Sequence, residues 1–152
     1  MQRVMTGFHL DDDGDWVAEL SCLHNQHIRH RPPFWNAAWI DDEAQREAHI
    51  GQLLDCPLCD RAELPEGLRR VRSTASWDER SVPAALTHAH RVAEGTWGLL
   101  EVEAGEVRFR ADTDPPLDVR VTATKPQPIP PSVDHRVEVR AGARFHVTFL
   151  TR

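Results

Sequence analysis

Three cysteines and a run of histidines place the strongest constraint on how this chain can fold. The pattern is C-x-H-x2-H-x2-H, followed by C-x2-C, at Cys22, His24, His27, His30, Cys56 and Cys59. Thiolates and imidazoles are the ligands that Zn²⁺ prefers, and a structural zinc site takes four of them in a tetrahedron. Because three thiolates need only one imidazole to complete such a site, the spacing predicts a closed zinc centre.

The spacing leaves the imidazole ligand open. His24 is favoured because residues 22 and 24 of an extended strand point the same way. His27 is the alternative ligand if residues 23–26 turn, and His30 is a weaker candidate. Two interpretations compete with zinc: buried cysteines without a metal, and a redox C-x2-C pair. A redox pair normally opens a helix after a strand, whereas this one follows a predicted helix.

Charge and composition divide the chain into two parts. Residues 1–62 hold 11 acidic and 5 basic side chains, whereas residues 63–152 hold 13 of each. The change falls at the sequence RAELPEG, whose Pro and Gly are typical of a linker. Sixty-two residues make a marginal core, which usually needs a disulfide or a metal for stability. We therefore expect a zinc-binding domain at 1–62 and a second domain at 63–152.

The first part is expected to be α+β, a β-hairpin plus a helix. Residues 3–9 and 16–21 have strand patterns, and the acidic segment DDDGD between them predicts a turn. Residues 41–54 predict a helix with Asp41 or Asp42 as its N-cap.

The second part is expected to be all-β. Strand patterns cover residues 95–102, 106–111, 117–124, 135–140 and 144–150. The connections between them are rich in Gly and Pro, and only residues 82–88 have a helical pattern. Short strands at such spacing predict an antiparallel sandwich or barrel.

Two histidines of the second part are candidate ligand-binding residues. His90 precedes a strand and His135 follows the Pro-rich sequence PIPP, so both are expected at one mouth of the barrel. Trp97 is the expected apolar wall of the pocket between them. Glu101 is a possible third partner, because Trp97, Leu99 and Glu101 share one face of their strand.

Composition excludes several classes of protein. No apolar run approaches the roughly 18 residues that span a bilayer, and the N-terminus has no apolar signal-peptide core. Three cysteines, an odd number, argue against a disulfide framework. A net charge of −6 disfavours nucleic-acid and membrane partners. We therefore expect a cytoplasmic protein with neither kind of partner.

The sequences WVAELSCLHNQHIRHRPP and LDCPLCD resemble a short bacterial domain of unknown function. The resemblance covers about residues 1–60, and it implies metal binding without implying an activity. The chain departs from the pattern at Leu23, where that family usually has Gly, and at Ala38, where Arg is expected before Trp39.

The second part contains LPEGLRRVRSTASWDERSVPAAL, HRVAEGTWGLLEVEAGEVRFR and IPPSVDHRVEV. These sequences resemble the cupin-like domain of B-type tellurite-resistance methyltransferases, which also occurs in small stand-alone bacterial proteins. The resemblance covers residues 64–152 and implies a jelly-roll barrel, with His90 and His135 at recurrent histidine positions. It does not imply a methyltransferase, because the chain has no Rossmann-type pattern.

These observations predict a non-enzymatic, metal-binding stress-response module. In this hypothesis Zn²⁺ is structural, and the cupin-like barrel binds a small molecule or an oxyanion through His90, Trp97 and His135. The alternative is a small cupin-type metalloenzyme in which His90 and His135 hold a catalytic metal.

Overall fold

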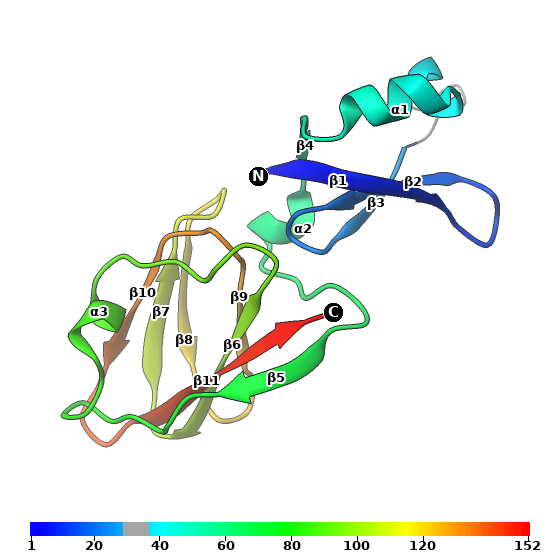
Figure 1. Cartoon of the computed structure of the whole chain (residues 1–152). Coiled ribbons are helices and arrows are strands. Elements are labelled where there is room, and N and C mark those ends of the chain that lie inside the picture. Colours follow the sequence, from blue (N-terminus) through cyan, green and yellow to red (C-terminus); the bar gives the residue numbers. More distant parts are fainter. Residues whose placement is uncertain (29–36) are drawn as a thin grey trace. The chain divides into compact units, whose positions relative to one another are not determined.

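A computed structural model describes residues 1–28 and 37–152 of the chain (Figure 1). The chain forms two compact units, Met1–Cys56 and Pro57–Arg152. Within the described residues, the helices are all too short or too polar to cross a lipid bilayer.

The first unit is built on a four-stranded antiparallel sheet with the order β3-β2-β1-β4. Its elements are β1 (Gln2–Leu10), β2 (Trp16–Leu20), β3 (Asn25–His27), the 3-10 helix η1 (Ala38–Asp41), α1 (Glu43–His49) and β4 (Leu53–Asp55). The predicted hairpin is present as β1 and β2, and Met5, Val17 and Leu20 are buried in the core of this unit.

The helix of the first unit is shorter than the sequence predicts. Asp42 caps α1 as expected, because its side chain accepts a hydrogen bond from the Gln45 amide at 2.9 Å. The helix ends at His49, since Ile50 is extended and Gly51 has a φ of 89°. Residues 53–55 then pair with β1 as strand β4. The prediction of a helix through residue 54 was wrong, because a strand partner was available.

The second unit contains most of the β structure. Its elements are α2 (Pro57–Asp60), β5 (Arg69–Ser73), α3 (Ala84–Thr87), β6 (Trp97–Ala104), β7 (Val107–Ala111), β8 (Leu117–Val121), β9 (Gln127–Ile129), β10 (His135–Val139) and β11 (Arg144–Thr151). They form a three-stranded sheet, β10-β7-β8, and a four-stranded sheet, β5-β11-β6-β9. All pairs are antiparallel, which confirms the antiparallel β prediction for this part.

Alternation of side chains gives the second unit its core. In β7 Val107, Phe109 and Ala111 are buried, whereas the arginines between them are only half-buried and form ion pairs with Asp118 or Glu138. Strands β5 and β9 were not predicted, because RRVRS has no apolar alternation and QPI lies in a Pro-rich segment. Both are edge strands, where Pro and charged side chains are tolerated.

Candidate functional site

The first half of the Cys/His cluster is made by the turn between β2 and β3. The Leu23 amide donates to the Leu20 carbonyl at 2.7 Å, and the Leu20 amide donates to the His24 carbonyl at 3.0 Å. Leu23 adopts a left-handed φ of 69°, which turns the chain between Cys22 and His24. The two ligands therefore lie on a tight turn, and not on the extended strand that the sequence argument assumed. Left-handed backbone favours glycine, which accounts for the Gly that the resembling family usually has where this chain has Leu23.

The second half of the cluster follows β4. The Cys56 amide donates to the Met1 carbonyl at 2.8 Å, and Cys59 lies in the short helix α2. The C-x2-C pair thus follows a strand and opens a helix, so the original reason for disfavouring a redox motif was wrong. The redox interpretation is weakened instead by the position of Cys22 and His24 beside the same pair.

Cys22, His24, Cys56 and Cys59 come together in one buried cluster. One potential ligand atom from each residue lies within 4.8 Å of all the others. The Nδ1 atom of His24 is 3.5 Å from the Cys22 Sγ and 3.4 Å from the Cys56 Sγ, and these two sulfurs are 3.9 Å apart. The three cysteines are at most 1% exposed and His24 is 4% exposed. This arrangement can hold one metal ion.

The sulfurs also set the protonation of His24. Burial lowers the pKa of this imidazole, but the Cys22 and Cys56 sulfurs outweigh burial and raise its pKa to about 9. The cluster therefore favours positive charge among its sulfurs. A bound cation would supply that charge and displace the imidazole proton.

Neither alternative histidine, His27 or His30, is part of the cluster that the structure describes. The His27 side chain is exposed, and its Nε2 atom lies 2.8 Å from the Asp11 carboxylate, on the hairpin side of the sheet. His30 falls outside the described residues. Of the histidines that the structure describes, His24 is the one in the cluster.

A separate cavity lies inside the second unit. It has a volume of about 380 Å³, and side chains of both sheets contribute to its wall. The lining is made of Val71, Arg72, Thr74, Trp77, Leu86, His90, Arg91, Val92, Ala93, Thr96, Ile129, His135, Val137, Phe145, Val147, Phe149 and Thr151. The cavity is within the size range of small-ligand sites, about 300 to 1,000 Å³.

His90 and His135 meet in this cavity. Their ring centroids are 4.1 Å apart, and an antiparallel bridge joins their backbones with hydrogen bonds of 3.1 and 3.0 Å. His135 is 4% exposed, and burial, with a smaller contribution from His90, lowers its pKa to about 4. The two rings thus approach each other as the sequence predicts, and His135 is neutral at pH 7. Their role in ligand binding stays a prediction.

The structure places Trp97 and Glu101 on the other face of the four-stranded sheet. In the β6–β11 register, Trp97 pairs with Leu150 and Glu101 pairs with His146, whereas the cavity residue Phe149 pairs with Gly98. Trp97 is fully buried but does not line the cavity. The expected apolar wall is formed instead by aromatic residues of other segments, because alternation along β6 turns Trp97 away.

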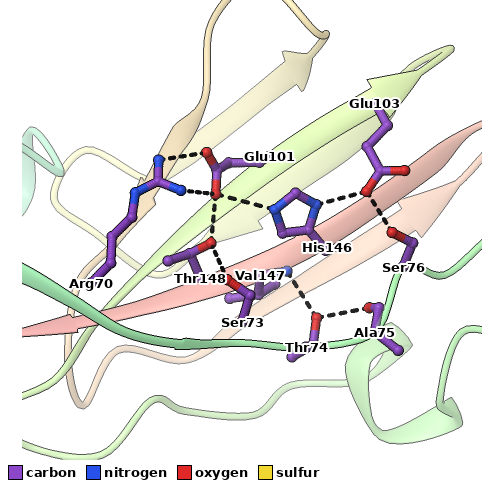
Figure 2. Close-up of polar contacts among 10 residues, drawn as sticks. All are labelled: Arg70, Ser73, Thr74, Ala75, Ser76, Glu101, Glu103, His146, Val147 and Thr148. Atoms are coloured by element: carbon purple, nitrogen blue, oxygen red, sulfur yellow. Dashed lines mark hydrogen bonds and ion pairs between the residues drawn. The ribbon is translucent and has the colours of Figure 1, made fainter.

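Glu101 belongs to a polar network on that opposite face (Figure 2). It accepts hydrogen bonds from Arg70 at 2.8 and 3.2 Å and from Thr148 at 2.6 Å, and it lies 3.2 Å from His146. Burial raises the pKa of Glu101, but the hydrogen bonds from Thr148 and Arg70 lower it further than burial raises it. Glu101 is therefore not a third partner of His90 and His135.

Sequence reasoning missed the aromatic and basic parts of the cavity wall. Phe145, Val147 and Phe149 alternate along β11 and all line the cavity, so their period of two was a usable signal. Trp77 and Arg72 carry no such signal. Arg72 reaches the cavity because β5 pairs with β11, a contact between residues more than 70 positions apart.

Two family models match different parts of the chain. A family described as a protein of unknown function, DUF3565, matches residues 6–63, and the TehB-like domain family matches residues 72–147. No curated protein matches the chain.

Two solved structures resemble the chain in fold. One is the crystal structure of a protein from E. coli (strain K12), with 21% identity and a TM-score of 0.52, covering 59% of this chain and 95% of that one. The other is TehB from Haemophilus influenzae, with 22% identity and a TM-score of 0.52. That match covers 57% of this chain but only 32% of TehB, so about a third of TehB is represented here. Because the match to the TehB-like domain spans half of the 152 residues, the chain belongs to the TehB-like domain family.

Proposed function

We propose that this protein is a non-enzymatic, tellurite-resistance-like stress-response module with a structural Zn²⁺ and a barrel that binds a small molecule. In this proposal residues 1–62 form the zinc-binding domain and residues 63–152 form a cupin-like jelly roll. The two antiparallel sheets with a cavity between them, and the alternation of β8, β9, β10 and β11 between these sheets, support the jelly-roll assignment.

The observation that carries the zinc proposal is the geometry of the cluster. Zn–S bonds of about 2.3 Å and Zn–N bonds of about 2.0 Å in a tetrahedron imply S···S edges of about 3.8 Å and S···N edges of about 3.5 Å. The corresponding distances here are 3.9 Å between sulfurs, and 3.5 and 3.4 Å between sulfur and Nδ1. Four protein ligands leave no open coordination position, so the ion would stabilise the fold and would not activate water.

The cavity supports a small organic ligand better than an oxyanion. Most of its lining is aliphatic or aromatic, and a bare oxyanion requires a ring of hydrogen-bond donors. One of its arginines, Arg91, is already engaged by the Asp134 carboxylate at 2.8 and 2.6 Å. An organic body can fill the apolar volume while a few polar groups fix its orientation.

A second candidate function is a cupin-type metalloenzyme with a metal held by His90 and His135. The observation in its favour is the 4.1 Å separation of the two rings. Among residues 1–28 and 37–152, however, the group of three or more potential ligands is at the cysteine cluster and not in this cavity. An ion held by two imidazoles alone would be weakly bound.

Elemental analysis of the full-length protein tests both proposals. We expect one zinc per chain in the wild type, none in His24→Ala, and one in the matched control His27→Ala. A wild type without zinc, or a His27→Ala variant that loses it, would overturn the zinc proposal. A second metal that disappears in His90→Ala would favour the metalloenzyme.

A further inference from the structure

The hydrogen bonds of the two cavity histidines define which ring nitrogen carries the proton. The Nδ1 atom of His135 is 2.9 Å from the Val133 carbonyl, and the Nδ1 atom of His90 is 3.0 Å from the His88 carbonyl. A carbonyl oxygen can only accept, so each Nδ1 must carry a hydrogen. In a neutral imidazole the other nitrogen then has a lone pair. Each ring therefore presents Nε2 as a hydrogen-bond acceptor.

These two acceptors are held in place and open to the cavity. Within the described part of the chain, no residue forms a hydrogen bond with the Nε2 atom of either ring. His135 is 4% exposed, yet it lines the cavity together with His90. The backbone bridge between the two residues fixes their separation. An acceptor that has no protein partner is available to a ligand, so a ligand that donates a hydrogen bond here gains free energy.

The rest of the wall limits the charge and shape of that ligand. The residues that line the cavity in the described structure include Arg72 and Arg91 but no Asp or Glu. The Arg72 guanidinium lies over the Phe149 ring, 4.3 Å from its centroid. Trp77 and Phe145, which also line the cavity, pack edge to face with each other. Because Arg91 is paired with Asp134, Arg72 is the uncompensated charge in this wall, and it disfavours a cationic ligand. An ionised carboxylate has only acceptor oxygens, and these would repel the lone pairs of the two Nε2 atoms. A ligand whose carboxylate lies against the histidines is therefore disfavoured.

We propose that the cavity binds an uncharged, hydroxylated aromatic molecule whose O–H donates a hydrogen bond to the imidazole pair and whose ring packs among Trp77, Phe145 and Phe149. This inference rests on the proposed function, because it requires the cavity to be a ligand site. The low pKa of His135 agrees with it, since a neutral ring keeps its acceptor at physiological pH. A volume of about 380 Å³ also exceeds the roughly 150 Å³ that encloses benzene in a dry protein cavity.

Three probes with one aromatic body test the inference. The metal-loaded full-length protein is titrated calorimetrically with 1-naphthol, 1-methoxynaphthalene and 1-naphthoate. We expect 1-naphthol to bind about fivefold more tightly than the other two, which is the typical effect of one hydrogen bond of about 1 kcal/mol. Binding of 1-methoxynaphthalene as tight as that of 1-naphthol would overturn the inference and leave the proposed function standing. If none of the three binds, the proposed ligand site fails as well.

Two variants test whether the imidazole nitrogens accept the hydrogen bond from the O–H group of 1-naphthol. In His90→Ala, the preference for 1-naphthol over 1-methoxynaphthalene should fall at least about threefold, because one of the two acceptors is removed. The matched control is His146→Ala, whose ring lies on the opposite face of β11 and outside the cavity. A preference that survives in His90→Ala, or is lost in His146→Ala, contradicts the inference. Loss of the buried His135 ring can unfold the protein, so His135 is tested in the wild type. We expect the ¹⁵N chemical shift of its Nε2 atom to change when 1-naphthol is added. An unchanged shift also contradicts the inference.

Discussion

Acid should destabilise the second unit through the single buried imidazole of His135. The ordinary pKa of histidine is 6.5, and burial lowers that of His135 to about 4. In the interval between these values the unfolded chain binds a proton that the folded chain does not. The contribution of His135 to stability is therefore complete above pH 6.5 and is lost as the pH falls toward 4. The difference of about 2.5 pKa units corresponds to about 3 kcal/mol.

Urea unfolding of the wild type and of His135→Gln measures this effect. Glutamine keeps a polar side chain but does not titrate, so the free energy of unfolding of the variant should vary less with pH. We expect the wild type to lose about 3 kcal/mol more than the variant between pH 7.5 and pH 4. The difference between the two proteins removes the contributions of His24 and the carboxylates, which are common to both. Equal losses, or an NMR titration of His135 with a midpoint near 6.5, would refute the reasoning.

Three further changes have expected outcomes. Cys56→Ser should abolish metal binding and unfold the first unit, because structural zinc contributes on the order of 10 kcal/mol to the free energy of folding. The β signal of the second unit should remain in the circular dichroism spectrum, and loss of the whole signal in one transition would contradict this. Leu23→Gly should raise the melting temperature, with a gain of up to about 1 kcal/mol from relief of the left-handed backbone. A lower melting temperature would show that the leucine side chain matters more. Gly98→Val should cost about 1 to 3 kcal/mol, because even a Cβ at this position would be 3.1 Å from Ile129; an unchanged urea midpoint would contradict this.

The features that the sequence predicted best depend on residues that are close together along the chain. The hairpin of β1 and β2 and the cap at Asp42 follow from local alternation and capping preference. The cluster of Cys22, His24 and the C-x2-C pair was predicted from the chemistry of its ligands. Its local geometry was not, since the turn at Leu23 uses a backbone conformation that leucine rarely adopts.

The features that sequence missed depend on distant partners. Residues 53–55 have a helical pattern, but they pair with β1 more than 45 residues earlier. Trp97 is predicted to wall the pocket because a buried aromatic beside a few polar groups is typical of a ligand site, whereas the face that it occupies is set by the register with β11. Register between strands 50 residues apart is not readable from one sequence, because a shift of one residue exchanges the two faces.

The order of strands in the second unit has a consequence for its synthesis. Strand β11, residues Arg144–Thr151, lies between β5 and β6 and pairs with both, although these strands precede it by many residues. The four-stranded sheet therefore cannot close on the ribosome until residue 151 has left the exit tunnel. Until then, among the strands that the structure describes, β5 has no strand partner and β6 pairs only with β9, so a nascent chain stalled before β11 exposes unpaired strand edges to chaperones and proteases.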